Sequence, residues 1–162
     1  ISACLVGHRV RFDGGVKTND LLMKYNERGR FIAVCPECFA MLPIPRPPME
    51  LQRTSGEKVL AGKGHALDKN GQDTTEYLIT GAEKVLKIAE AYHVRVAILK
   101  ERSPSCGTHF VHTGKFDGKT MKGMGVCAAL LEAHGIKVYS DEEMTVGRLE
   151  SLLSEDKLRD RD

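Results

Sequence analysis

Apolar residues in this chain gather in short runs that alternate with stretches of helical periodicity. Three β-branched and aliphatic runs, at residues 31–34, 94–99 and 136–139, predict buried strands, and residues 1–4 predict the end of another. Between these runs, apolar side chains recur at helical spacing across residues 74–92, which predicts the clearest helix. The pattern therefore predicts alternating strands and helices.

Further elements follow from the same pattern. Shorter helices are predicted at residues 18–29 and 125–134. A last amphipathic helix at residues 142–153 leads into a charged tail, residues 154–162. Residues 108–122 alternate apolar and polar side chains around glycine turns, which predicts a β-hairpin that serves as a flap.

The order of these elements indicates the fold class. Strands that alternate with helices predict a parallel sheet covered by helices. We expect one α/β domain, residues 1–153, with a mainly parallel sheet in a three-layer, Rossmann-like arrangement and the hairpin flap beside it. The length of 162 residues suits a single domain whose core needs no disulfide or metal. Ligands of such sheets bind outside the carboxyl ends of the strands.

Three cysteines stand where predicted strands end. Cys4 and Cys35 follow two of the runs, and Cys106 lies in the Lys-Glu-Arg-Ser-Pro-Ser-Cys-Gly turn after a third. Three soft sulfur ligands without an obvious fourth fit an iron–sulfur cluster with one open iron, or zinc with an open position. The plainer interpretation makes each cysteine a small buried hydrophobe. The shared placement at three strand ends favours a metal site.

Side chains near these cysteines supply candidate chemistry. Glu37 can act as general acid or base, and Ser103 and Ser105 as proton donors or orienting hydroxyls. Arg46 lies in a stiff proline run, where its guanidinium would clamp an anion or a carbonyl. Four cations are candidates for substrate contact, although each is equally compatible with an ordinary surface position: Arg9, Arg11, Arg46 and Lys100.

Composition narrows the class of protein. The net charge of +2, without a basic stripe, argues against a nucleic-acid partner. No run approaches the roughly 18 apolar residues of a membrane span. Five cysteines are an odd number for a disulfide framework, and the start shows no secretory signal pattern. We therefore expect a cytoplasmic protein whose thiols are free to bind metal.

Longer motifs carry a resemblance to a known family. From its first residue to about Met144, the chain resembles the thiouracil desulfidase family of bacterial iron–sulfur domains. The three blocks that carry the resemblance are jointly very specific. They are Ser-Ala-Cys-Leu-Val-Gly with Val-Arg-Phe-Asp-Gly-Gly, then Val-Cys-Pro-Glu followed by Leu-Pro-Ile-Pro-Arg-Pro-Pro-Met-Glu, and finally Leu-Lys-Glu-Arg-Ser-Pro-Ser-Cys-Gly.

The resemblance implies a [4Fe-4S] cluster held by Cys4, Cys35 and Cys106. The fourth iron would be open to the thione sulfur of a thiolated pyrimidine, since soft iron prefers soft sulfur. That iron would act as a Lewis acid and accept the departing sulfide while water attacks the ring carbon. The implied reaction exchanges sulfur for oxygen, without net redox change, on a thiouracil base, nucleoside or nucleotide.

The acid and base roles are a hypothesis that builds on this reaction, and between the two serines the resemblance favours Ser103. We expect Glu37 to manage the protons of the attacking water and the ring nitrogen. Ser103 is expected to donate a proton to the leaving sulfur or the ring, whereas Ser105 shapes the turn.

Cys38 departs from the small or apolar residue expected after Cys-Pro-Glu. It forms a Cys-x-x-Cys pair with Cys35, which by itself would indicate a thioredoxin-like redox site or half of a zinc site. A redox motif of this kind normally begins a helix, and the proline run after Cys38 leaves little room for one. Cys127 lies in an apolar helical pattern and is predicted to be a core residue.

Two other classes of function stay open. One is a non-catalytic iron–sulfur or zinc module that binds a partner or senses redox state. The other is a desulfidase for thiouridine in tRNA, although the short, nearly neutral chain favours a small substrate.

The flap residues give no second site: His109 and His112 should point to opposite faces of a strand. The lysines of the flap are predicted to be solvated surface residues: Lys115, Lys119 and Lys122.

Overall fold

The parallel pairing predicted from the hydrophobic runs is present in one two-stranded sheet. In this computed structural model, which describes residues 1–159, β3 (Val96–Leu99) pairs in parallel with β6 (Lys137–Ser140). Val96 lies opposite Lys137 and Leu99 opposite Ser140. The aliphatic residues of β3 suit a strand that is buried on both faces.

The first residues of the chain lie beside β3. The amide of Ser2 donates to the carbonyl of Ile98 (3.0 Å), and Ser2 also forms a parallel bridge with Val34. Regular pairing stops there because the 3-10 helix η1 (Ala3–Val6) follows at once. The two predicted strands nearest the start of the chain are therefore reduced to bridge partners.

The remaining strands pair in antiparallel fashion. Strand β1 (Met49–Leu51) pairs with β2 (Ala66–Asp68), and β4 (Phe110–His112) pairs with β5 (Thr120–Lys122). Residues 1–159 thus contain three two-stranded sheets, and one mainly parallel, Rossmann-like sheet in three layers is not confirmed. The β4–β5 pair is the hairpin expected at residues 108–122, while its action as a flap stays a prediction.

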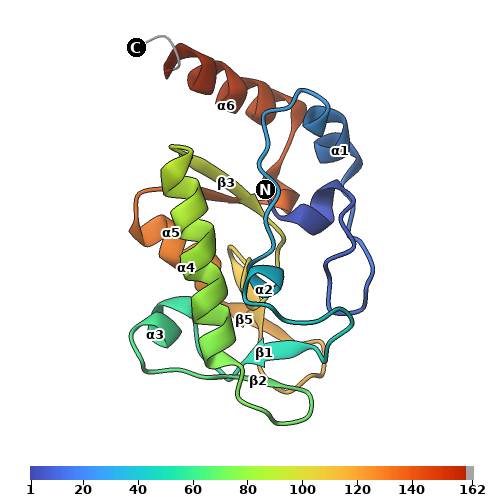
Figure 1. Ribbon diagram of the computed structural model, residues 1–162, viewed down its shortest axis with the longest axis vertical. Helices are drawn as coiled ribbons and strands as arrows, with labels where there is room; N and C mark the ends of the chain where they lie inside the picture. The colour runs from blue at the N-terminus through green and yellow to red at the C-terminus, as the bar shows by residue number, and fades with distance from the viewer. Residues whose placement is uncertain (160–162) are drawn as a thin grey trace.

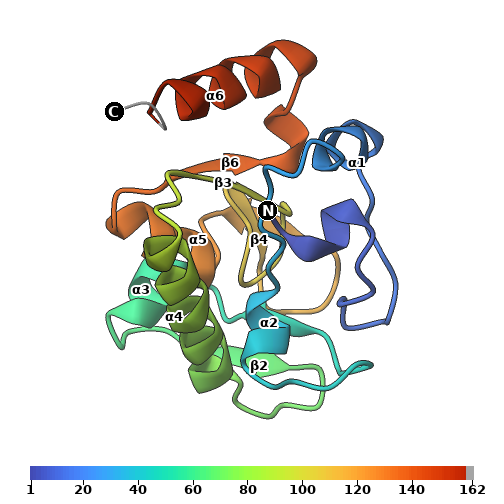
Figure 2. The ribbon, with the colours of Figure 1, turned by 45° about the horizontal axis from the view of Figure 1, so that its top comes forward.

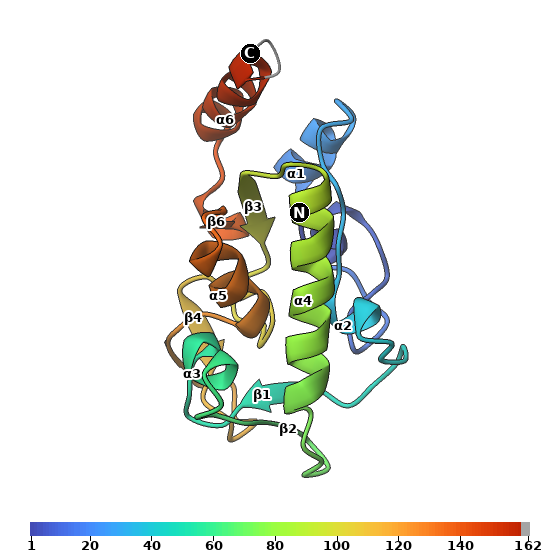
Figure 3. The ribbon, with the colours of Figure 1, turned by 60° about the vertical axis from the view of Figure 1, so that its left-hand side comes forward.

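Helix α4 (Thr75–Ala91) carries the apolar face that the sequence predicts, with Leu78, Ala82, Val85 and Ala89 buried. It stands upright in the ribbon with α2 (Pro36–Phe39) and α5 (Val126–Ala133) beside it (Figure 3). The other helices are α1 (Asp20–Asn26), α2 (Pro36–Phe39), α3 (Gly56–Leu60), α5 (Val126–Ala133) and α6 (Val146–Arg159), with the 3-10 helix η2 (Asp141–Glu143) before α6.

Side chains of β3 alternate between two hydrophobic clusters. Ala97 and Leu99 pack with residues of α4 and α5, whereas Ile98 packs with residues of η1, α1 and α6. Helices therefore cover both sides of this strand, as the ribbon shows (Figure 1). The single α/β domain is confirmed, and Cys127 is a fully buried core residue, as predicted.

The C-terminal helix is longer than predicted. Helix α6 continues through residue 159, where the sequence predicts a charged tail after residue 153. Ion pairs join α6 to the body of the protein, from Arg28 to Glu150 (2.6 Å) and, in the stretch after residue 153, from Arg30 to Asp156. Residues 160–162 of the predicted tail lie outside the described residues, and the domain boundary stays a prediction. No helix in residues 1–159 is long and apolar enough to cross a membrane.

Candidate active site

Three segments that are distant in the sequence bring their cysteines to one cavity. Cys4, Cys35 and Cys106 all line a cavity of about 570 Å³. Cys4 lies in η1, Cys35 directly precedes α2, and Cys106 follows β3. In the ribbon, the N-terminal segment, α2 and the end of β3 come together near the middle of the molecule (Figure 2). The spatial convergence expected at strand ends is therefore present.

The turn that carries Cys106 is fixed against the first turn of α5. The carbonyls of Pro104 and Ser105 accept hydrogen bonds from the first amides of α5, at 2.9–3.1 Å. The Ser103 hydroxyl accepts from the amides of Ser105 and Cys106, both at 3.1 Å. Gly125 permits this approach, because a Cβ there would lie 2.5 Å from the backbone of Ser105. The protein backbone itself thus sets the position of the Cys106 thiol.

A buried carboxylate holds the segment that follows Cys106. Glu101 is 3% exposed and accepts hydrogen bonds from the amides of Thr108 (2.9 Å), His109 (2.9 Å) and Phe110 (3.0 Å). Burial alone would raise the pKa of Glu101, but these amides and the Ser140 hydroxyl outweigh it, so that the pKa is lowered. Sequence reasoning missed this role, because the acceptor and its donors are brought together only by the turn.

Cys35 stands at the start of a one-turn helix, which corrects the sequence analysis. Pro36 occupies the first helical position of α2, where its missing N–H costs nothing. The helix ends at Phe39, before the proline run begins, so that run did leave room for it. The thiols of Cys35 and Cys38 both lie near the carbonyl of Val10, at 3.9 and 3.7 Å. Burial raises the pKa of Cys35 to about 12, whereas a reactive Cys-x-x-Cys thiol has a lowered pKa. This environment argues against a thioredoxin-like site.

The other two cavity thiols are also buried. Burial raises the pKa of Cys4, an effect that Arg11 and Lys100 partly offset. Burial, together with the neighbouring Cys127 thiol, raises the pKa of Cys106 well above its usual range. Thiols in such surroundings are deprotonated when a metal binds them, and nearby cations then offset the negative charge.

Glu37 is fixed by Arg46, which the sequence analysis proposed as a substrate clamp. Arg46 Nε donates to Glu37 Oε1 (3.1 Å), and its side chain is only 3% exposed. Its two other nitrogens donate to the carbonyls of Pro43 (3.1 Å) and Val10 (2.8 Å). All three nitrogens therefore already have partners within the protein. Arg46 lines the cavity, but its guanidinium binds Glu37 and the loop at Val10, so it supports the site from within the protein.

The structure places the remaining candidates in two groups. Ser103, Arg11 and Lys100 line the cavity with Glu37. Arg9 is exposed and Ser105 is buried, and neither lines the cavity. Further residues that were not singled out as candidates also line the cavity, among them Phe12, Lys17, Glu50, Lys69 and Phe116.

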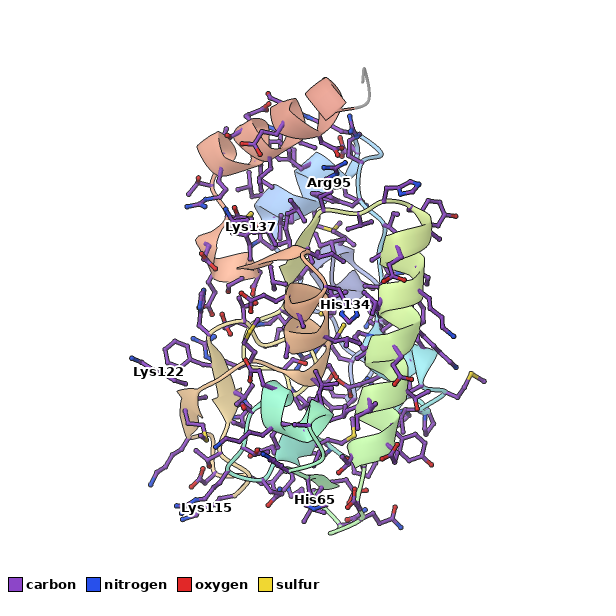
Figure 4. All side chains as sticks on the ribbon, turned by 90° about the vertical axis from the view of Figure 1, so that its left-hand side faces the viewer. His65, Arg95, Lys115, Lys122, His134 and Lys137 are labelled. Carbon is purple, nitrogen blue, oxygen red and sulfur yellow. The ribbon has the colours of Figure 1, made fainter. Side chains whose placement is uncertain are left out.

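Histidines and lysines of the hairpin take separate positions. His109 Nε2 contacts Glu143 Oε1 (2.6 Å), whereas His112 lines the cavity. Lys115 and Lys122 point away from the body of the protein, as expected for solvated side chains (Figure 4). Within residues 1–159, no group of three His, Cys, Asp or Glu side chains is arranged to hold a single metal ion.

Comparison with known proteins agrees with the motifs that surround the cavity. The family model for 2-thiouracil desulfurase matches residues 1–143. The chain belongs to this desulfurase family. A curated relative in Bacillus subtilis (strain 168), named as the uncharacterized protein YbbK, is 37% identical over 144 residues, which are 89% of this chain and 95% of YbbK.

A solved structure extends the comparison to three dimensions. The [4Fe-4S]-dependent thiouracil desulfidase TudS is 39% identical in sequence and superposes with a TM-score of 0.80. The match covers 94% of this chain and 95% of TudS. The desulfurase-family assignment that the sequence motifs imply is thus confirmed, together with the single α/β domain.

Proposed function

We propose that this protein is a desulfidase that replaces the thiocarbonyl sulfur of a thiolated pyrimidine with oxygen and releases sulfide. The observation that carries the proposal is the convergence of Cys4, Cys35 and Cys106 on one cavity that Glu37 and Ser103 also line. Membership of the 2-thiouracil desulfurase family and the similarity to TudS support it.

The residues present fit a [4Fe-4S] cluster. Three thiols from three separate segments line one cavity of about 570 Å³, and cysteine thiolates are the ligands that iron–sulfur clusters take. Cys4, Cys35 and Cys106 would hold the cluster. When bound, it supplies a Lewis-acidic iron with a free position for the thiocarbonyl sulfur. Arg11 and Lys100 partly offset the effect of burial on the pKa of Cys4, so they would also offset the charge of its thiolate.

Glu37 and Ser103 perform the proton transfers in this proposal. Arg46 orients the carboxylate of Glu37, which takes a proton from the water that attacks the ring carbon. The Ser103 hydroxyl accepts two backbone N–H groups, so its own proton is free to be donated to the leaving sulfur. A carbon–oxygen bond forms, the carbon–sulfur bond breaks, and no electron is gained or lost. Water and thione become carbonyl and hydrogen sulfide.

The cavity accommodates more than the pyrimidine ring. Three lysines line it beside Arg11, namely Lys17, Lys69 and Lys100. Cations of this kind suit the phosphate of a nucleotide. A free base or a nucleoside has no phosphate and would not make this contact with the lysines. The substrate tests therefore include all three forms of 2-thiouracil and 4-thiouracil, with thiolated tRNA as the macromolecular comparison.

The proposal is tested with protein purified without oxygen. Iron and acid-labile sulfide are counted, and sulfide release is then measured with each substrate. A brown protein that releases sulfide is expected. A protein that holds stoichiometric zinc, or a brown protein that desulfurates none of the substrates, would refute the proposal.

Matched variants separate the roles of neighbouring residues. Cys35→Ser should lose iron, whereas Cys38→Ser, on the same helical turn, should keep it. Glu37→Gln should keep the cluster but lower kcat about 10²–10⁴-fold, the usual contribution of a general acid or base. Iron loss in Cys38→Ser but not in Cys35→Ser would contradict the assignment of ligands.

A further inference from the structure

The turn of the β4–β5 hairpin is fastened to strand β1. Glu50 in β1 is 8% exposed, and its Oε1 accepts hydrogen bonds from the amides of Gly114 (2.9 Å) and Phe116 (3.2 Å). The carbonyl of Thr113 accepts from the amide of Arg53 (2.9 Å). A nearly buried carboxylate and a backbone bond thus hold the predicted flap in place.

Phe116 adopts a backbone conformation that a bulky residue rarely takes. Its φ is +54°, in the left-handed region, and the glycines on either side of it in the turn, Gly114 and Gly118, also have positive φ. Such a conformation persists only where the surroundings determine it, and strained residues gather at ligand sites. Here the Glu50 carboxylate binds the Phe116 amide directly. The result is a phenylalanine held at the cavity that contains the three cysteines and Glu37.

We propose that Phe116 is a specificity-determining residue, whose ring packs against the face of the pyrimidine, and that Glu50 is the residue that positions it. This inference rests on the proposed function. Aromatic side chains bind flat bases through their faces, which leaves the base edges free. The thiocarbonyl and the ring nitrogens are then free to face Ser103, Glu37 and the side of the cavity where the cysteines would hold the cluster. Phe12 also lines the cavity, but the Arg11 guanidinium already lies 5.4 Å from the centre of its ring.

The test compares one substitution at two positions of the same hairpin. Phe116→Leu removes a cavity ring, whereas Phe110→Leu removes a ring that does not line the cavity. Anaerobic holoenzyme is used to measure the KM for 2-thiouracil, and the Kd for uracil by calorimetry. Phe116→Leu should raise both about tenfold, as loss of base stacking predicts. Phe110→Leu should leave both within about twofold of the wild type.

Two further measurements separate stacking from a merely structural role. The saturated ring of 5,6-dihydro-2-thiouracil is puckered and stacks poorly, so Phe116→Leu should weaken its binding much less than that of 2-thiouracil. Glu50→Ala should weaken uracil binding as Phe116→Leu does, and the double variant should show little added loss. Glu50→Gln retains an acceptor oxygen for the two amides and should restore most of the affinity.

The outcomes distinguish this inference from the proposed function. Sulfide release by the wild type, with equal uracil affinity in Phe116→Leu and Phe110→Leu, would overturn the role of Phe116 and leave the desulfidase intact. Equal losses for 2-thiouracil and its dihydro analogue would also overturn it, because the ring would then act only as support. A wild-type holoenzyme that binds uracil and 2-thiouracil no better than Phe116→Leu does would overturn the role of Phe116, and one that also desulfurates no form of 2-thiouracil or 4-thiouracil would refute both proposals.

Discussion

Glu101→Gln should destabilise the protein far more than an ordinary surface substitution. In the wild type, one carboxylate oxygen accepts three backbone amides within hydrogen-bond distance, and the residue is only 3% exposed. Hydrogen bonds to charged groups contribute about 1.5–3 kcal/mol each, against about 0.5–1.5 kcal/mol for neutral ones. Because the three bonds share one oxygen, their losses are not additive. We expect the free energy of unfolding to fall by about 2–3 kcal/mol, out of a typical 5–15 kcal/mol.

The effect should depend on pH with a definite sign. Because the pKa of Glu101 is lowered in the folded protein, its stabilisation is fully present above the unfolded value near 4.5. It is lost as the pH falls through the lowered folded pKa. The difference between wild type and Glu101→Gln should therefore be largest near neutral pH and shrink in acid.

Urea unfolding, followed by circular dichroism across this pH range, measures the effect. Glu142→Gln is the matched control, since it removes the charge of an exposed carboxylate that pairs with Arg102, a contact worth about 0–1 kcal/mol. Hydrogen exchange gives a local readout, because the amides of Thr108, His109 and Phe110 should lose protection in Glu101→Gln. Equal destabilisation by the two variants, with unchanged protection of these amides, would refute the reasoning.

Two further substitutions test the supports of the cavity. Gly81→Ala would place a Cβ 2.1 Å from the Pro36 carbonyl, so it should cost about 1–3 kcal/mol by overpacking and lower the iron content by shifting Cys35. Gly147→Ala in α6 is the control, because a Cβ there meets nothing within 4 Å, and its free energy of unfolding should rise by up to about 1 kcal/mol. Equal urea midpoints for Gly81→Ala and Gly147→Ala would contradict the overpacking at Gly81. Arg46→Lys keeps the charge but cannot reproduce all three hydrogen bonds, so kcat per cluster should fall by about 10²-fold with little change in KM. A raised KM with unchanged kcat would instead make Arg46 a substrate ligand.

Local patterns were sufficient to predict β3 and α4, but not the helices η1 and α2 beside Cys4 and Cys35. The aliphatic run of β3 and the helical period of α4 are strong because they bury continuous apolar faces. The position of Cys106 after a strand likewise follows from an apolar run that ends in a turn. The convergence of the three cysteines follows from strand ends that meet beside β3, even though the pairing there is reduced to single bridges.

Contacts between distant residues could not be predicted in the same way. Glu50 and Phe116 are 66 positions apart, and only the packing of the hairpin against β1 brings them together. Arg46 was a candidate for substrate contact because a sequence does not show which carbonyls of the protein lie near a guanidinium. The proline run after Cys38 was taken to leave little room for a helix, but α2 needs only one turn and ends at Phe39, before that run begins. Pro36 suits its first helical position.

The fastening of the Cys106 turn to α5 has a consequence for protein engineering. The carbonyls of Pro104 and Ser105 cap the first amides of α5, and Gly125 leaves space for their approach. A chimera that exchanged only the turn between relatives would separate these acceptors from their donors. Residues 101–133 should therefore be transplanted as one cassette, with the Glu101 carboxylate at its start and α5 at its end.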